Sequence, residues 1–317
     1  MSRIFVALLS AAFLPLPFLH GQAVISARSG MVNFVEGQAR IAEQPVKLDG
    51  AIFPEVKVGQ TLTTQAGFAE VLLTPGVFLR LDRNSSFRML ANKLTDTQVE
   101  IVSGSALVEA NEILKDNRIL VKMGDSETAL VKRGLYHFNA DAGQVRTFDG
   151  KAQVSAGDKS TELKGGRTLL VDSALDVNKF DKKKAKGELY AWSQQRDYRL
   201  ELANISAARV TNRKSLTSSM WAWDPWLSTF TFLPMSGYGY SPFGFSWYSP
   251  ATVWVVFQPA PSYGYGGYQA SAPSWQGASP SAGYSAPSSN ASSGVVGVSS
   301  GSSSGAVAAS AGASRGR

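Results

Sequence analysis

The stretch that decides the fold is residues 67–81, Gly-Phe-Ala-Glu-Val-Leu-Leu-Thr-Pro-Gly-Val-Phe-Leu-Arg-Leu. Side chains alternate on both sides of Pro75-Gly76, a pattern typical of two β-strands joined by a tight turn. One face is wholly apolar and consists of Ala69, Val71, Leu73, Val77, Leu79 and Leu81. We expect this face to be buried and the opposite face, with Arg80, to point to water.

The same short alternation, interrupted by glycines, extends from about residue 24 to residue 176. A second hairpin is predicted from 145–148 and 151–154, with Asp149-Gly150 as its turn, because Asp-Gly readily adopts the positive φ angles of two-residue turns. A third pair is expected from 98–102 and 106–108 around Ser103-Gly104. The pattern predicts a mainly β domain, and both a β-sandwich and a short β-solenoid fit it.

A basic linker, residues 177–187, separates this domain from a segment with helical periodicity. Its dense lysine run at 182–186 is typical of a solvated stretch. Over residues 188–209 apolar side chains recur every three to four positions, which predicts one amphipathic helix. Trp192 and Arg196 lie on its apolar stripe, so we expect both to dock the helix, with the Arg196 guanidinium on the indole or paired with an acid of the β domain.

Residues 220–268 are rich in aromatic residues, Gly and Pro and contain one charge, Asp224. Two interpretations stay open: the segment folds back over the helix and the β domain, or it forms a surface for ligand contact or self-association. The candidate contact residues are Trp221, Trp223, Trp226, Tyr238, Tyr240, Phe243, Trp247 and Trp254. Residues 269–317 are mostly Ser, Gly and Ala, a composition that predicts a disordered tail.

The first 23 residues have the composition of a secretory signal peptide, with Arg3 followed by an apolar stretch and then small and polar residues. We therefore expect an exported protein, periplasmic or at the cell surface, with no transmembrane helix after cleavage. An uncleaved signal acting as an anchor is the alternative. Since the chain has no Cys, lipidation at cysteine and disulfides are excluded.

Catalytic candidates are few, because His137 is the only histidine beyond the signal peptide. With no Cys and one His, triad chemistry and histidine-based metal sites lack partners. Gly165-Gly166 lacks the lysine and serine of a phosphate-binding loop and is interpreted as a turn. We expect no enzyme activity, no cofactor, no metal site and no nucleic-acid partner, although the net charge is +7.

Residues 58–86 carry a family resemblance. Val58-Gly59-Gln60-Thr61-Leu62, the alternating stretch at 67–81 and Asn84-Ser85-Ser86 together resemble the FecR domain family, with Gln60 and Pro75 where Asp is usual. The likeness extends over about residues 30–171, through Val102-Ser103-Gly104 and the segment at 145–154. It favours a rolled or solenoid-like antiparallel β domain, with a β-sandwich as the alternative. The segment after residue 188 resembles C-terminal extensions of FecR-domain proteins in soil bacteria such as acidobacteria.

The resemblance implies two functions. Founding FecR proteins place a sigma-factor-handling segment in the cytoplasm and a sensor domain in the periplasm, and we expect this chain to lack the cytoplasmic segment. Our first hypothesis is therefore a non-enzymatic exported binding or scaffold protein of the cell envelope, whose partner is an envelope protein or a cell-wall glycan. The alternative is an accessory sensor in sigma-factor-linked signalling, anchored by an uncleaved signal peptide.

Overall fold

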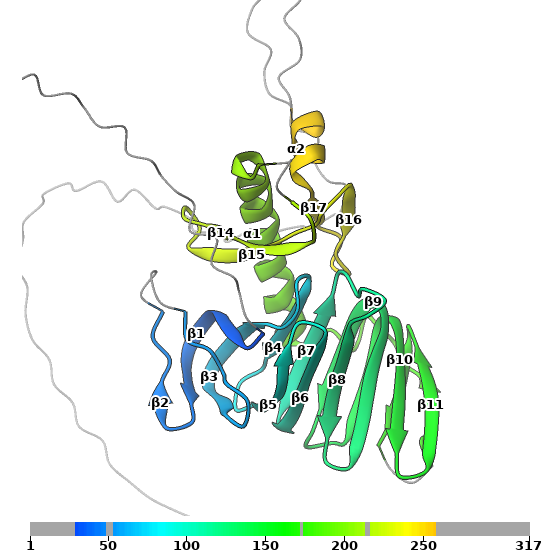
Figure 1. Cartoon of the computed structure of the whole chain (residues 1–317). Coiled ribbons are helices and arrows are strands. Elements are labelled where there is room, and N and C mark those ends of the chain that lie inside the picture. The colour runs from blue at the N-terminus through cyan, green and yellow to red at the C-terminus, as the bar shows by residue number, and fades with distance from the viewer. Residues whose placement is uncertain (1–28, 49–52, 172–173, 213–215, 258–317) are drawn as a thin grey trace, which may run out of the picture. The chain divides into compact units, whose positions relative to one another are not determined.

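The computed structural model describes residues 29–48, 53–171, 174–212 and 216–257 (Figure 1). The expected signal peptide, residues 258–268 of the aromatic segment and the expected tail lie outside them. The strands are β1 (Met31–Ile41), β2 (Gln44–Pro45), β3 (Thr61–Leu72), β4 (Val77–Leu81), β5 (Ser86–Lys93), β6 (Asp96–Ser103), β7 (Ser105–Ala110), β8 (Arg118–Met123), β9 (Ser126–Asn139), β10 (Gln144–Ala156), β11 (Lys159–Lys164), β12 (Arg167–Leu170), β13 (Asn178–Lys179), β14 (Met220–Asp224), β15 (Thr229–Leu233), β16 (Tyr238–Tyr240) and β17 (Ser246–Tyr248). The helices are α1 (Glu188–Val210) and α2 (Pro250–Val256).

The first thirteen strands form one rolled sheet, which we call the β-roll. Seven of them close a ring of hydrogen-bonded neighbours in the order β3, β4, β7, β9, β8, β6, β5 and back to β3. Every pairing in the ring is antiparallel except the parallel pair of β6 and β8. Strands β1 and β2 extend the sheet beyond β3, and β10 to β13 extend it beyond β9. The mainly β, rolled antiparallel fold is therefore confirmed.

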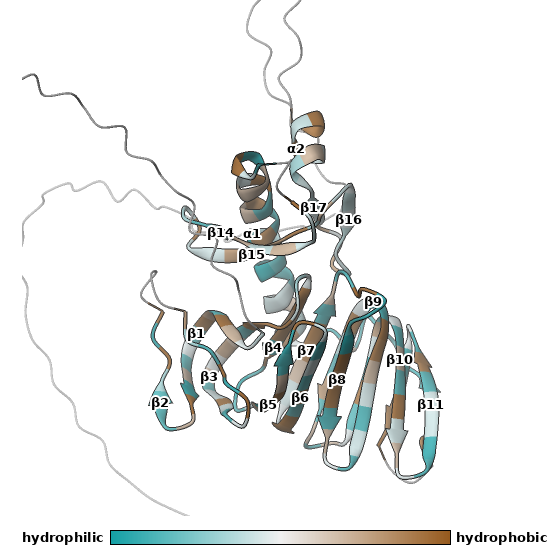
Figure 2. Cartoon of the chain, viewed as in Figure 1, coloured by the Kyte–Doolittle hydropathy of each residue, from teal (hydrophilic) through white to brown (hydrophobic). Residues whose placement is uncertain are grey.

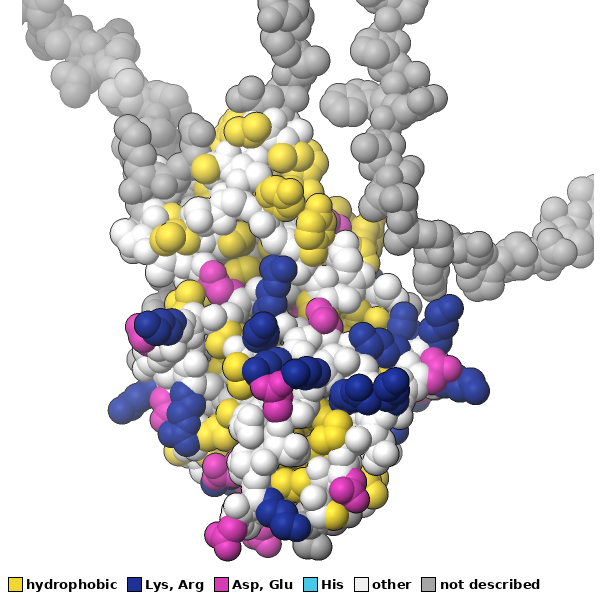
Figure 3. Space-filling model, turned by 90° about the vertical axis from the view of Figure 1, so that its right-hand side faces the viewer, with side chains coloured by type: hydrophobic (Ala, Val, Ile, Leu, Met, Phe, Trp, Pro, Cys, Tyr) yellow, Lys and Arg dark blue, Asp and Glu magenta, His cyan; other side chains and the backbone are white. Residues whose placement is uncertain are grey.

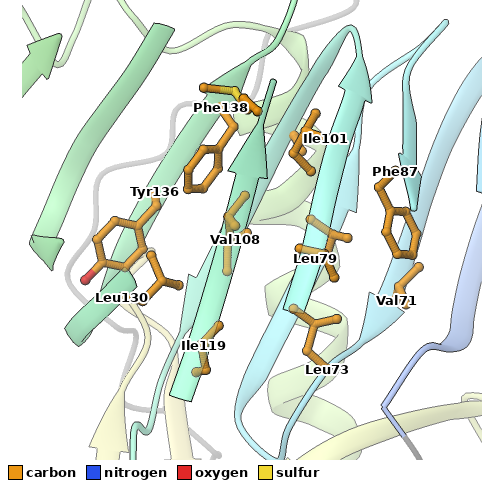
Figure 4. Packing of buried hydrophobic residues seen from close by; sticks show 14 of the residues in the cluster. Val71, Leu73, Leu79, Phe87, Ile101, Val108, Ile119, Leu130, Tyr136 and Phe138 are labelled. Atoms are coloured by element: carbon orange, nitrogen blue, oxygen red, sulfur yellow. The ribbon is translucent and has the colours of Figure 1, made fainter. Parts of the chain in front are cut away.

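The hairpin at 67–81 is confirmed in register and in its inner face. Val71 of β3 lies opposite Leu79 of β4, and Ala69 lies opposite Leu81. All are fully buried and point into the roll, where they meet Phe87, Ile101, Val108, Tyr136 and Phe138 from the other strands (Figure 4). A closed roll can bury one side chain in two from every strand, which is why alternation of apolar residues specifies it.

The other two predicted hairpins are wrong in their connections. Residues 144–156 form the single strand β10, and Asp149-Gly150 makes a bulge in it where the pairing with β9 shifts register. Gly150 does take a positive φ of 91°, but the turn is a kink and not a reversal. The opposing Gly134 is needed because a Cβ there would overlap the Asp149 carbonyl. Residues 96–110 do form strands β6 and β7, but these do not pair with each other: β6 pairs with β5 and β8, and β7 pairs with β4 and β9.

The predicted helix is confirmed as α1, and the residues after it build a second layer, which we call the C-terminal layer. It consists of the hairpins β14–β15 and β16–β17 and the short helix α2, an element that the proline-rich sequence did not predict. The layer packs on α1 and on the strands below it, in the same compact unit as the β-roll. Figure 2 shows teal and white along the turns of α1 nearest the β-roll and both brown and teal at its far end.

Among the described residues, no helix combines the length and the apolar character needed to cross a membrane. The longest one, α1, spans 23 residues but carries two charged side chains, Arg196 and Asp197, on the face that it buries.

Candidate functional site

The outer face of the hairpin β3–β4 is buried as completely as the inner one. Glu70 and Arg80 lie directly opposite each other on this face and are both fully buried, so the prediction that Arg80 faces water is wrong. The physical reason is that α1 and the C-terminal layer cover this face. Leu72 and Phe78 on the same face pack against Trp221 and Trp247 of that layer.

Arg80 is the centre of a buried charge cluster that joins the β-roll to α1. Its Nε donates to Glu70 Oε2 at 2.9 Å, and its Nη2 donates to Asp197 Oδ1 of α1 at 3.0 Å. Its Nη1 pairs with Glu109 of β7. Arg196, also on α1, donates to Glu70 Oε1 at 2.8 Å. Glu70 is therefore held between two guanidinium groups, one from each side of the interface.

The protonation of the cluster follows from its two cations and three carboxyl groups. Burial alone would raise the pKa of Glu70, but Arg196 and Arg80 outweigh it and lower the pKa to about 2. Burial, and then the charge of Asp197, raise the pKa of Glu109 well above its usual range. Burial also raises the pKa of Asp197. We infer that one proton stays on the Glu109–Asp197 pair, so the cluster is neutral with Glu70 ionised.

Arg196 and Trp192 both face the β-roll, as a docking role requires. The Arg196 guanidinium lies 4.0 Å from the ring centroid of Phe34 in addition to its pair with Glu70. Trp192 stacks on Phe68 with a centroid separation of 4.9 Å. Its indole Nε1 donates to Glu36 at 2.8 Å.

Two asparagine side chains fix the backbone of the C-terminal layer. Asn33 of β1 donates to the Phe230 carbonyl at 2.9 Å and accepts from the Phe230 N–H at 2.8 Å. Asn204 of α1 donates to the carbonyls of Phe232 and Tyr248 and accepts from the Tyr248 N–H. Because these bonds are made to backbone groups in both hairpins, the layer has a fixed position on the β-roll and α1.

The eight candidate contact residues divide by exposure. Trp221, Phe243 and Trp247 are buried within the chain, and Trp223 is half-buried between Phe53 and Phe230. The four exposed ones are Trp226 (88%), Tyr238 (61%), Tyr240 (58%) and Trp254 (45%). The described part of the segment thus folds back over α1 and the β-roll and leaves four of the candidate aromatic rings exposed, whereas a role in ligand contact or self-association stays a prediction.

Trp226 lies at the tip of the hairpin β14–β15, in a turn with fixed geometry. The buried Asp224 carboxylate accepts a hydrogen bond from the Leu227 N–H at 2.8 Å. Pro225 restricts the backbone before Trp226, and Ser228 closes the turn with a φ of 46°. The most exposed large apolar side chain among the described residues is thus held on a rigid support.

A cavity of about 180 Å³ lies where the N-terminus of α1 meets β7, β9 and β10, and His137 lines it together with Arg146 and Asp82. Burial, and then the charge of Arg146, lower the pKa of His137 to about 4, so its imidazole is neutral at pH 7. Its Nδ1 receives no hydrogen bond from the described residues.

No family model matches the chain, and no curated protein matches it. Among solved structures, the chain is similar to two crystal structures, at 2.50 and 1.65 Å resolution, of a proposed anti-sigma factor from Parabacteroides distasonis. Each is 15% identical with a TM-score of 0.33 and covers 42% of this chain. The match spans 64% and 63% of those chains, less than two thirds of their length.

Proposed function

We propose that this chain is a non-enzymatic, exported binding protein of the cell envelope, in which a FecR-like β-roll supports a rigid aromatic surface that contacts a protein partner. The observation that carries the proposal is the exposure of Trp226 on a preorganised turn. The FecR-like motifs at 58–86 and the signal-like composition of residues 1–23 support the placement in the envelope.

The energetic argument favours a partner at Trp226. Tryptophan is the residue type most enriched among interface hot spots, where its truncation typically costs about 2 kcal/mol or more. The backbone of the turn that carries Trp226 is already held by the bond from the Leu227 N–H to Asp224, so its ordering on binding costs little conformational entropy. The exposed apolar neighbour at the tip is Leu227, which gives a protruding pair that fits an apolar protein pocket. A glycan would instead call for a broader stacking platform.

The test is site-specific photo-crosslinking in the envelope fraction, with a photoreactive amino acid in place of Trp226. The expected result is one protein adduct that is absent when the same group replaces Leu170, a half-exposed residue on β12. The captured protein should then bind Trp226→Ala about 30-fold more weakly than wild type, whereas Leu170→Ala binds normally. Adducts to cell-wall glycan alone, or no adduct from either position, would refute the proposal.

Export is tested separately by the intact mass of the chain purified from its native host. Removal of the first 21 to 23 residues, with recovery in the periplasmic or extracellular fraction, is the expected result. An intact N-terminus in the inner-membrane fraction would instead support the anchored sensor and overturn the exported form.

A further inference from the structure

Strand β16 has one edge paired with β17 and one edge open. The pairing sets Tyr238 opposite Tyr248, Gly239 opposite Trp247 and Tyr240 opposite Ser246. The bonds from Ser249 N to Gly237 O and from Ser241 N to Phe245 O flank this pairing at both ends.

These flanking bonds fix which backbone groups point outward. In an antiparallel pair, hydrogen-bonded and non-hydrogen-bonded positions alternate, so Gly239 bonds to Trp247 while Tyr238 and Tyr240 do not bond to β17. Their N–H and C=O groups therefore point away from β17, and none of the described residues bonds to them. Both tyrosine side chains lie on the outer face of the hairpin and are mostly exposed.

The other edge of this two-stranded sheet is already occupied by α1. Glu201 accepts a hydrogen bond from the Ser246 N–H at 2.8 Å, and Asn204 bonds to both backbone groups of Tyr248. Any strand added to the sheet must therefore add at β16.

The charge distribution favours a second copy of this chain at that edge. The chain carries a net charge of +7, but among residues 216–257 the one charged side chain is Asp224, which is buried. Figure 3 shows the same separation, with Lys and Arg gathered on the β-roll and hydrophobic side chains over the C-terminal layer. Two copies that meet at β16 thus keep their cationic surfaces apart.

We propose that two copies of this chain associate by pairing β16 with β16 in antiparallel register about Gly239. A two-fold axis through Gly239 sets Gly239 of one copy opposite Gly239 of the other. Tyr238 of each copy faces Tyr240 of the other, and their outward N–H and C=O groups make four hydrogen bonds. The sheet β17–β16–β16–β17 has no open edge, so association stops at the dimer.

The size of the contact sets its strength. Four tyrosine rings bury at most about 150–250 Å² each, which places the interface among small, transient ones. We therefore expect dissociation in the micromolar range or weaker, measurable by sedimentation of the purified full-length chain over micromolar to millimolar concentrations. This surface is separate from Trp226, so its failure and that of the proposed function are distinguishable: Trp226→Ala should leave the dimer unchanged.

A charge exchange tests the register. Tyr240→Lys and Tyr238→Glu should each weaken self-association at least about tenfold, because each leaves an unpaired charge at the edge. The double variant Tyr238→Glu with Tyr240→Lys places Glu opposite Lys at both positions, and self-association should return. Val131→Lys, which adds the same charge at an exposed position of β9, is the matched control and should not change it. Near-UV circular dichroism checks that each variant keeps the native fold.

The proposal is overturned if the wild-type chain stays monomeric at the highest concentration, or if natively folded Tyr238 and Tyr240 variants dimerise like wild type. Failure of the double variant to recover would exclude the antiparallel register. Loss of the dimer in Trp226→Ala would place the contact between copies at the tip of the β14–β15 hairpin instead of at β16. Photo-crosslinking from position 240 that captures a different protein or a glycan, and no second copy, would also overturn it.

Discussion

Replacing Glu70 with glutamine and, separately, Glu109 with glutamine gives two variants that differ only in which buried carboxylate of the charge cluster is removed. Both side chains are fully buried, and both contact Arg80. If Glu70 is ionised and Glu109 holds the shared proton, glutamine removes a charge in the first case and imitates the existing neutral form in the second. We therefore expect opposite outcomes from the same chemical change.

The magnitudes follow from the shift of the Glu70 pKa from 4.5 to about 2, which corresponds to about 3 kcal/mol of stabilisation of the ionised form. Removing one partner of a buried ion pair typically costs about 3–5 kcal/mol. Glu70→Gln should thus lower the free energy of unfolding at pH 7 by about 3 kcal/mol, and Glu109→Gln by less than about 1 kcal/mol. For a folded unit of this size, 3 kcal/mol lowers the melting temperature by roughly 6–12 °C.

The assay is urea unfolding followed by the fluorescence of the buried tryptophans, repeated from pH 4 to pH 9. The pKa of Glu109 is raised in the folded state above its usual value of 4.5. The contribution of Glu109 to folding stability is therefore complete below pH 4.5 and is lost as the pH rises toward the folded-state pKa. The stability of Glu109→Gln relative to wild type should therefore increase with pH. The pH dependence of the Glu70 contribution has the opposite sign: this contribution to folding stability is present above pH 4.5 and is lost as the pH falls toward 2.

Equal destabilisation by the two substitutions would refute this assignment of the proton. So would a larger loss in Glu109→Gln, since it would show that Glu109 is the ionised member. Asp197→Asn distinguishes the remaining case: if the proton resides on Asp197, this variant is the nearly neutral one and Glu109→Gln is not.

Four further substitutions test the β-roll. Gly67→Ala should abolish folding or strongly reduce stability in urea unfolding, because a Cβ at this position would overlap the Glu36 carbonyl. Gly59→Ala is the control: nothing lies within 4 Å of its Cβ, so the free energy of unfolding should fall by only about 1–2 kcal/mol, from the positive φ of this residue. Tyr136→Phe removes a hydroxyl that hydrogen bonds to backbone groups on both sides of the β9–β10 bulge, and should cost about 1–3 kcal/mol in the same assay. NMR titration of His137 should give a pKa of about 4. As the pH falls from 6.5 to 4, the free energy of unfolding of the wild type should therefore decrease, whereas that of His137→Gln should not show this decrease.

How far the sequence predicts this fold depends on where each partner lies in the chain. The inner face of β3–β4 needs only local alternation and was predicted residue by residue. The burial of Arg80 was not predicted, because its partner Asp197 lies 117 residues away on a helix. No local sequence pattern reveals where that helix docks. A signal was nevertheless present: Leu72 and Phe78 share the face of Arg80, so that face was too apolar for solvent.

The bulge at Gly150 shows a second limit. Asp-Gly favours positive φ, and both a two-residue turn and a bulge use it, so the dipeptide alone cannot say whether the strand reverses or continues. What distinguishes them is Gly134 on the opposing strand, where the missing Cβ lets the two backbones approach. In the C-terminal layer, composition likewise could not separate Trp226 from Trp247, since Trp226 lies in the turn of one hairpin and Trp247 in a strand of the other.

Helix α1 and the C-terminal layer together cover the outer face of the β-roll and complete its packing. Without α1, Arg80 would lose Asp197, Glu70 would lose Arg196, and the outer face around Phe78 would be open to water. Burial of the cluster therefore ties the position of α1 to the folding of β3 and β4. Because Asn33 and Asn204 then fix both hairpins by their backbones, the turn that carries Trp226 and the open edge of β16 are each held in place before any partner arrives. A rigid support reduces the entropy lost on association, which is why the contacts proposed above need only a small number of exposed rings.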